Sequence, residues 1–425
     1  MTHVVCGDYL VLSPRKVIRN ACVRFNERIV EIFERGEGGD EGVTIVSHGL
    51  SSLHTHLGLY PIRYSLLNGL ELDEWARRCA WPWERALFEN PKVSYYSAIL
   101  ALRELVMGGV TLVADMHFNE DIIGRAFKDV GVRGDLSVAL LSSNGFNFRQ
   151  LLESNLDLLR VFKDEELISV RLGPCTPRLL KPGEFRFVVE LAMEYGIGIH
   201  THLGEVPEDH YSLVRNYGIT LGEFVKSVGL AKVNAIVAHA IWLFDAYPLL
   251  ARENIYVAHP PRANVLLNDG VANVLEMSGS DINVGLAIDV APTYRIIDDI
   301  RASYCMQYAQ LQERMDVEDL WNMATAGYRA LNLGSGEVRV GERADIVVWR
   351  CRSCAKDLIE PLATLVWGAF EAVDVFVGGK PVLLNGRLAR LSSSDINRAF
   401  SEVAQFINDL SPGLRSCFRL SSRRC

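Results

Sequence analysis

The chain has 425 residues and a formal net charge of −8, with 49% hydrophobic and 23% charged residues. This is the composition of a globular protein that is long enough to bury a large core. The acidic balance disfavours a nucleic-acid polymer or an anionic membrane as a partner, and no apolar run is long enough to span a bilayer. Because the N-terminus lacks the layout of a signal peptide, the sequence predicts a cytoplasmic protein.

The nine cysteines are scattered over the whole chain. An odd number without regular spacing is not the pattern of a secreted disulfide framework. Cys351 and Cys354 form the one C-x-x-C pair, which leaves three interpretations open: a zinc site, two ordinary thiols or a local disulfide.

Residues 1–45 have the pattern of short strands and turns, and the pattern changes at residue 46. From there to residue 336, short apolar runs alternate with helix-like segments at intervals that suit β-α repeats with right-handed crossovers. This region predicts an α/β fold, a (β/α)₈ TIM-type barrel. Its eight predicted strands lie within residues 43–56, 110–116, 133–141, 167–173, 197–203, 233–240, 254–260 and 282–289.

Short strands return over residues 337–392, and together with residues 1–45 they predict a small β-sandwich domain built from both chain termini. Residues 393–425 are predicted to form a C-terminal helix and tail. Ser394 is the expected N-cap of that helix, and Pro412 lies past its end. The apolar face of the helix is expected to contain Ile396, Phe400, Val403, Ile407 and Leu410.

Histidines and one aspartate lie at the ends of the predicted barrel strands. In such barrels the active site is formed at the C-terminal ends of the strands. His54 and His56 lie on the same side of the first strand, because side chains alternate along a strand. With His202 and Asp289 from other strands, these imidazoles could hold a divalent metal ion and leave a position for water.

Several motifs, in this order, resemble the amidohydrolase superfamily. They include LHTHLGL (53–59), IHTHLGEV (199–206), VAHAIWL (237–243), VGLAID (284–289) and GEVRVGERADIVVW (336–349). The likeness is to the group that contains cytosine, guanine and adenosylhomocysteine deaminases and triazine hydrolases. It implies a barrel hydrolase with a flanking β domain.

The resemblance implies that His54, His56, His202 and Asp289 are the metal ligands. It implies a divalent ion, most often zinc and in some members iron. The predicted function is cleavage of a C–N bond, the hydrolytic deamination of an N-heterocycle by metal-activated hydroxide.

The same resemblance assigns catalytic roles to Glu205, His239 and Asp289. Asp289 would accept a proton from the attacking water, and Glu205 would pass a proton to a ring nitrogen. His239 would lie over the substrate and polarise the group under attack.

His200 shares a strand face with His202 but lies one pleat deeper, so we expect it to pack below the metal site or to support a ligand. Some relatives bridge two metals with a carboxylated lysine on the fourth strand. Here that strand, ISVRLGPC, contains no lysine, which predicts a single metal ion.

Three substrate-facing segments depart from the pattern of the deaminases. Cys175 replaces a histidine of a P-H-[ST]-P motif, and the segments that begin at His259 and at Asp289 are also altered. Purine specificity is therefore left open. The substrate-contact residues expected at this mouth, each with surface or lid packing as the alternative, are Trp81, Trp83, Asn144, Arg149 and Arg178. Cys175 is expected to be a pocket wall, a weak hydrogen-bonding group or a nucleophile, and His259 to bind substrate or to support the residues around the site.

Two other functions stay open from the sequence. One is a hydrolase of the same fold that releases a different group, such as an amide product, a halide, an alkylamine or a formimino group. The other is a non-catalytic barrel that binds a metabolite. The expected partner is a small-molecule substrate, and assembly into a homo-oligomer is compatible with the sequence.

Overall fold

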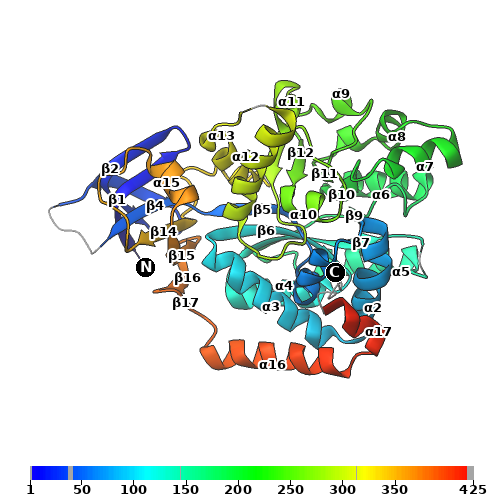
Figure 1. Ribbon diagram of the computed structural model, residues 1–425, viewed down its shortest axis with the longest axis horizontal. Coiled ribbons are helices and arrows are strands. Elements are labelled where there is room, and N and C mark those ends of the chain that lie inside the picture. The colour runs from blue at the N-terminus through cyan, green and yellow to red at the C-terminus, as the bar shows by residue number, and fades with distance from the viewer. Residues whose placement is uncertain (1, 37–41, 144, 313, 419–425) are drawn as a thin grey trace, which may run out of the picture.

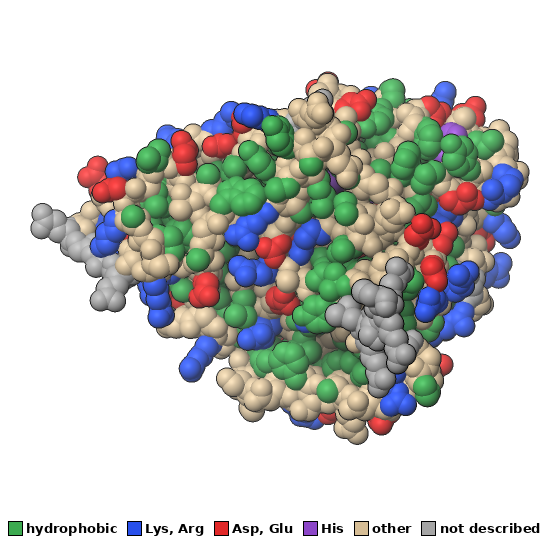
Figure 2. All heavy atoms as spheres, viewed as in Figure 1, with side chains coloured by type: hydrophobic (Ala, Val, Ile, Leu, Met, Phe, Trp, Pro, Cys, Tyr) green, Lys and Arg blue, Asp and Glu red, His purple; other side chains and the backbone are tan. Residues whose placement is uncertain are grey.

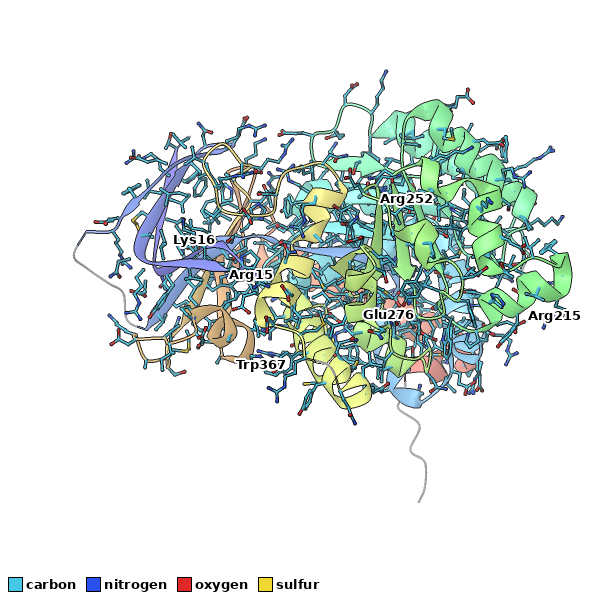
Figure 3. The ribbon with its side chains drawn as sticks, turned by 90° about the horizontal axis from the view of Figure 1, so that it is seen from above. Arg15, Lys16, Arg215, Arg252, Glu276 and Trp367 are labelled. Carbon is cyan, nitrogen blue, oxygen red and sulfur yellow. A yellow bond between two sulfur atoms is a disulfide. The ribbon has the colours of Figure 1, made fainter. Side chains whose placement is uncertain are left out.

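The computed structural model describes residues 2–36, 42–143, 145–312 and 314–418. The molecule is elongated: strands from both ends of the chain form one end, and parallel strands surrounded by helices form the bulk (Figure 1). Arg15 and Lys16, beside the turn between two terminal strands, lie far along the long axis from Arg215 (Figure 3).

The bulk of the molecule contains two parallel sheets. One has the order β5-β6-β7-β8, with β9 also paired to β7, and the other has the order β10-β11-β12-β13. Each of the eight predicted runs overlaps at least one of these strands, and the fourth run overlaps both β8 and β9. Strands β6 and β9 each end one residue beyond the predicted run. Their bounds are β5 (Leu50–Thr55), β6 (Val110–His117), β7 (Arg133–Leu140), β8 (Ile168–Val170), β9 (Gly173–Pro174), β10 (Ile199–Leu203), β11 (Ala235–His239), β12 (Ile255–His259) and β13 (Asn283–Leu286).

Backbone contacts connect the two parallel sheets on both sides. Leu172 bridges to Ile199 at the start of β10, and Thr55 at the end of β5 bridges to Asp289. The Asp289 N–H donates to the His54 carbonyl at 2.9 Å, which ties the segment after β13 to β5. This contact brings two of the predicted metal ligands together.

The first predicted strand is two strands separated by Gly49. Val43–His48 forms β4, which pairs with terminal strands, and Leu50–Thr55 forms β5 of the parallel sheet. A Cβ atom on Gly49 would lie 1.9 Å from Thr111 Oγ1, so the chain can pass from one sheet to the other only with glycine here.

The terminal strands form one sheet of eight, in the order β17-β16-β15-β14-β4-β1-β2-β3. The central strand β4 pairs in parallel with β1 and antiparallel with β14. One buried cluster beneath this sheet includes Leu10, Phe25, Val46, Ile346 and Phe376. The remaining strands are β1 (His3–Ser13), β2 (Lys16–Phe25), β3 (Ile29–Glu34), β14 (Ile346–Cys351), β15 (Glu371–Val377), β16 (Lys380–Leu384) and β17 (Arg387–Leu388).

Helices follow most of the parallel strands and cover them from outside (Figure 1). Those between β5 and β10 are η1 (Leu57–Asn68), α1 (Leu72–Trp75), the π-helical η2 (Ala76–Ala80), α2 (Trp81–Glu89), α3 (Pro91–Met107), α4 (Glu120–Val130), α5 (Phe148–Val161) and α6 (Pro182–Tyr195). The later ones are α7 (Glu208–Tyr217), α8 (Leu221–Val228), η3 (Leu230–Lys232), α9 (Tyr247–Leu250), α10 (Pro261–Leu266), α11 (Val274–Gly279), α12 (Ile296–Leu311), α13 (Val317–Ala324), α14 (Ala326–Ala330) and α15 (Pro361–Trp367).

The C-terminal helix α16 (Ser393–Asp409) lies along α3 and is followed by α17 (Pro412–Arg415) and η4 (Ser416–Phe418) (Figure 1). Its N-cap is Ser392 and not the predicted Ser394, because Ser392 and Asp395 form a capping box. Ile396 and Val403 are buried as expected, whereas Phe400 is 49% exposed.

The described residues contain three disulfides: Cys6–Cys22, Cys79–Cys417 and Cys351–Cys354. The C-x-x-C pair is therefore a local disulfide, one of the three interpretations left open. Acidic and basic side chains are interspersed over the face drawn in Figure 2. Among the described residues, no helix is long and apolar enough to cross a membrane.

Candidate active site

The predicted metal ligands meet at the C-terminal ends of the parallel strands. His54 lies in β5, His56 directly follows it, and His202 lies in β10. The Nε2 atoms of His56 and His202 are 3.3 Å apart. Asp289 Oδ1 lies 3.4 Å from His54 Nε2 and 3.3 Å from His56 Nε2. Four ligand atoms from distant parts of the sequence thus surround one point.

Backbone carbonyls set the tautomers of two of these histidines. The Nδ1 atom of His56 lies 2.7 Å from the Met116 carbonyl, and that of His202 lies 2.8 Å from the Cys175 carbonyl. A carbonyl only accepts, so in each ring Nδ1 carries the proton. The Nε2 lone pair of each ring is then left free toward the shared point.

A chain of side chains sets the tautomer of His54. The Ser137 hydroxyl donates to the Asp115 carbonyl and can therefore accept from His200 Nδ1, which is 3.2 Å away. His200 Nε2 is then an acceptor for the His54 Nδ1 proton at 2.9 Å. His200 lies one pleat below His202, as expected, and its contact is with His54.

The site fits one divalent ion. His54 Nε2 is buried and has no hydrogen-bond partner in the described part of the chain. Burial lowers the pKa of His54, His56 and His202, so the three rings are neutral and able to bind metal. In a tetrahedron with metal–nitrogen bonds of about 2.0–2.1 Å, ligand atoms are roughly 3.3–3.4 Å apart. The three distances given above match this spacing. One joins His56 to His202, and the other two join Asp289 to His54 and to His56.

Two site residues have left-handed backbone conformations that are rare for residues other than glycine. The φ angle is +73° at His239 and +56° at Asp289. Such conformations cost free energy and occur where the surrounding structure holds them. Here each one turns the chain at the end of a strand and directs its side chain toward the cluster of histidines.

Glu205 and His239 lie beside the ligand cluster. His239 Nε2 is 3.5 Å from Glu205 Oε1, and its Nδ1 lies 2.8 Å from Asn264 Oδ1. An amide oxygen accepts only, so His239 Nδ1 carries a proton. Burial raises the pKa of Glu205 to about 7, which places its titration in the range where a group can both accept and donate protons.

A cavity is lined by Glu205 and by three of the predicted metal ligands, His56, His202 and Asp289. Three of the predicted substrate-contact residues line it: Trp81, Cys175 and Arg178. Arg178 is already bonded to Asp209 and Asp73, at 2.7 Å and 2.8 Å. Most of the wall is apolar, with Leu59, Leu72, Trp75, Met116, Phe118, Leu141 and Leu179 among its residues.

The other predicted contact residues are not among those that line this cavity. Trp83 is fully buried, donates to the Gly58 carbonyl and packs against Phe406 and Phe418. Arg149 is exposed in the first turn of α5. His259 is buried, with Nε2 at 3.3 Å from the Ser303 hydroxyl. Asn144 lies outside the described residues.

Sequence reasoning missed several residues of the site. Asn264 orients His239, and Asp209 accepts the Glu205 N–H at 2.8 Å. Glu84 lines the cavity, and burial raises its pKa to about 8. The spacing of Asp209, four residues after Glu205, is a signal that could have found it. Asn264 lies in the short helix α10, and only the fold shows that its side chain points at His239.

Known proteins are similar to this chain over most of its length. The model of the Amidohydrolase family matches residues 45–382. A 5-methylthioadenosine/S-adenosylhomocysteine deaminase of Pyrococcus horikoshii is 29% identical over 89% of this chain and 93% of its own. A deaminase of the same name from Desulforudis audaxviator is 30% identical over 84% of this chain and 85% of its own length. A zinc-bound adenosine deaminase structure from Xanthomonas campestris has a TM-score of 0.84 at 22% identity and covers 97% of this chain and 98% of its own.

Proposed function

Because this chain belongs to the amidohydrolase family, we propose that it is a metal-dependent deaminase that hydrolyses an amino group from an N-heterocycle. The observation that carries the proposal is the meeting of three imidazole lone pairs and the Asp289 carboxylate at one point, with Glu205 beside them. Neutral imidazoles with one carboxylate are ligands that suit a catalytic divalent ion.

His54, His56, His202 and Asp289 would hold a single divalent ion. Zinc is the proposed metal, supported by the ligand set and by the zinc in the similar adenosine deaminase structure. When bound, such an ion supplies a water molecule that is acidic enough to act as a nucleophile near neutral pH.

The side chains around the ligands would move the protons. Asp289 accepts a proton from the attacking water, and Glu205 donates one to the ring nitrogen beside the carbon under attack. Protonation makes that carbon more electrophilic, and the amino group leaves as ammonia after it has taken a proton. His239 is held by Asn264 with its Nε2 edge toward Glu205, where it can bond the group under attack.

The substrate class that we propose is a heterocycle with an apolar substituent. The curated relatives are named as deaminases of adenosine derivatives, and the cavity wall is largely apolar. Arg178 is held by two carboxylates, which disfavours its use for an anionic group on the substrate. Burial raises the pKa of Cys175, so this residue acts as a cavity wall and not as a nucleophile.

Several finer features also stay proposals. We propose that the parallel strands close into a (β/α)₈ barrel over residues 46–336, supported by the bridges at Leu172 and Thr55. The terminal strands of residues 1–45 and 337–392 would form a β-sandwich, and residues 393–425, of which 419–425 lie outside the described residues, a C-terminal helix and tail. A cytoplasmic location and a homo-oligomeric state are predictions from the sequence.

A deamination screen tests the proposed function. Metal-loaded protein is incubated with adenosine, 5′-substituted adenosines, guanine, cytosine and pterins, and free ammonia is measured. We expect release from at least one compound, and a loss of about 10²–10⁴-fold in kcat in Glu205→Gln with the metal content unchanged. No ammonia from any aminated ring, or full activity in Glu205→Gln, would contradict the proposal.

A further inference from the structure

Asp269 is a buried carboxyl group near Glu205 for which the proposed mechanism has no role. It lies after α10, and the residue is 2% exposed. Its backbone is held from two sides: its N–H donates to the Asn264 carbonyl at 2.8 Å, and the Trp242 indole N–H donates to its carbonyl at 2.7 Å. These bonds fix the residue and keep its side chain in the interior.

Neither carboxyl oxygen of Asp269 has a hydrogen-bond partner in the described part of the chain. One carboxyl oxygen of Asp269 lies within 4.8 Å of a carboxyl oxygen of Glu205 and of a ring nitrogen of His239. The Glu205 and His239 atoms are equally close to each other. An ionised carboxylate is costly to bury without a partner. Groups on Glu205 and His239 lie close enough to offset part of this cost.

The other charged groups around this cluster are mainly acidic. Asp209 lies in the first turn of α7 and accepts the Glu205 N–H, and Asp289 is one of the proposed metal ligands. Arg178 is bonded to Asp209 and Asp73 and is shared among these carboxylates. Two carboxyl groups this close to each other in a buried site do not both ionise readily, because each negative charge opposes the other.

We propose that Asp269 and Glu205 hold one proton between them, which makes Asp269 a positioning residue that keeps Glu205 able to donate a proton at neutral pH. The role of Glu205 as proton donor rests on the proposed function, whereas the shared proton does not. In agreement, burial and then the charge of Glu205 raise the pKa of Asp269, and burial raises that of Glu205 to about 7. The raised values keep the protonated form present.

Infrared difference spectroscopy of the metal-loaded protein tests the shared proton directly. At about pH 7, wild type minus Asp269→Asn and wild type minus Glu205→Gln should both show the loss of one protonated-carboxyl band, since either change leaves one ionised carboxylate. Asp281→Asn is the matched control: the residue is exposed, and asparagine suits its left-handed backbone. The control should show no loss of this band.

If this protonated-carboxyl band remains in either variant, the proposal is overturned, because the carboxyl group left in that variant would then hold the proton alone. If Asp269→Asn does not fold, Asp269→Ser removes the charge with a smaller side chain and is judged by the same criterion. These spectra need no substrate. A failed deamination screen would therefore reject the proposed function and leave the shared proton to be decided by the spectra.

The pH dependence of kcat/KM gives a second readout. Without the negative charge of Asp269, Glu205 should lose its proton at lower pH, so the alkaline limb of the profile should shift down by about one pH unit or more. At pH values below the alkaline limb, the Asp269→Asn variant should remain active. An equal loss at every pH would show a merely structural role and contradict the proposal.

Discussion

At the scale of single residues, the pentapeptide HTHLG has two different uses. In the first copy, His54 and His56 both direct Nε2 toward the shared point, whereas in the second only His202 does. His200 instead accepts a hydrogen bond from His54 and fixes its tautomer. The second copy thus supplies one proposed ligand, His202, and through His200 it also fixes the tautomer of His54 in the first copy.

Replacing His200 should weaken metal binding. In His200→Leu the Nδ1 proton of His54 loses its acceptor, and the ring is free to turn or change tautomer. Loss of such an outer partner lowers metal affinity by about 10–100-fold. A competition titration with a zinc chelator measures this effect.

His210→Gln is the control for that titration, because His210 lies on α7 and bonds the Leu221 N–H away from the metal ligands. Affinity in the control should match wild type. An unchanged affinity in His200→Leu would show that His54 needs no such support.

The meeting of the proposed metal ligands could be predicted from sequence because each lies at the end of an apolar run. The support that His200 gives to His54 was also among the expectations. The residues around Glu205 and His239 could not be predicted: Asn264 lies in the short helix α10 and Asp269 in the segment after it, where no periodicity shows which way a side chain points. Trp83 was expected at the substrate and instead packs against Phe406 and Phe418, since an aromatic residue near a cavity also suits a core.

At the scale of elements, Gly49 separates β4 from β5, so that one apolar run contributes a strand to each of two sheets. All eight runs were predictable, because buried parallel strands are almost continuously apolar. The break at Gly49 within the first run was not predictable, since it depends on how closely Thr111 of β6 packs against Gly49. The start of α16 was displaced by two residues because two serines could each act as the cap.

Gly49→Ala should destabilise the fold. The added methyl group would overlap Thr111 and force the two sheets apart, at a cost of about 1–3 kcal/mol in the free energy of unfolding. Urea unfolding followed by circular dichroism measures the difference.

Gly183→Ala in α6 provides the matched control, because no atom lies within 4 Å of the position of its added Cβ. Alanine is also the better helix former, so this variant should be as stable as wild type or slightly more stable. Equal stability of Gly49→Ala and wild type would mean that the junction can adapt.

At the scale of the whole molecule, a buried ion pair joins the parallel strands to the terminal sheet. Arg133 in β7 bonds Asp345, just before β14, through Nε at 2.7 Å and Nη2 at 3.0 Å. Tyr328 and the Gly378 N–H also donate to Asp345. Elsewhere, the Cys79–Cys417 disulfide ties the C-terminal segment to the helices that form the cavity wall.

Asp345→Asn should cost about 3–5 kcal/mol of unfolding free energy, because it leaves the buried Arg133 without its counter-charge. Burial acts to raise the pKa of Asp345, but the charge of Arg133 and the bonds it donates outweigh burial and lower it. The stabilisation is therefore present above the unfolded pKa of about 3.9 and is lost as the pH falls below it.

Urea unfolding of wild type and Asp345→Asn from about pH 7 down to about pH 3 measures this contribution. The difference between the two proteins should shrink as the pH falls below about 4. A difference that stays constant with pH would show that the ionised carboxylate is not what joins the two parts of the molecule.

The central claim is that one divalent ion is held by His54, His56, His202 and Asp289. An anomalous difference map from zinc-loaded crystals, measured at the zinc absorption edge, tests it most directly. We predict a single strong peak in contact with the Nε2 atoms of the three histidines and with Asp289. No peak at this point, or a peak bound to His200, would contradict the account.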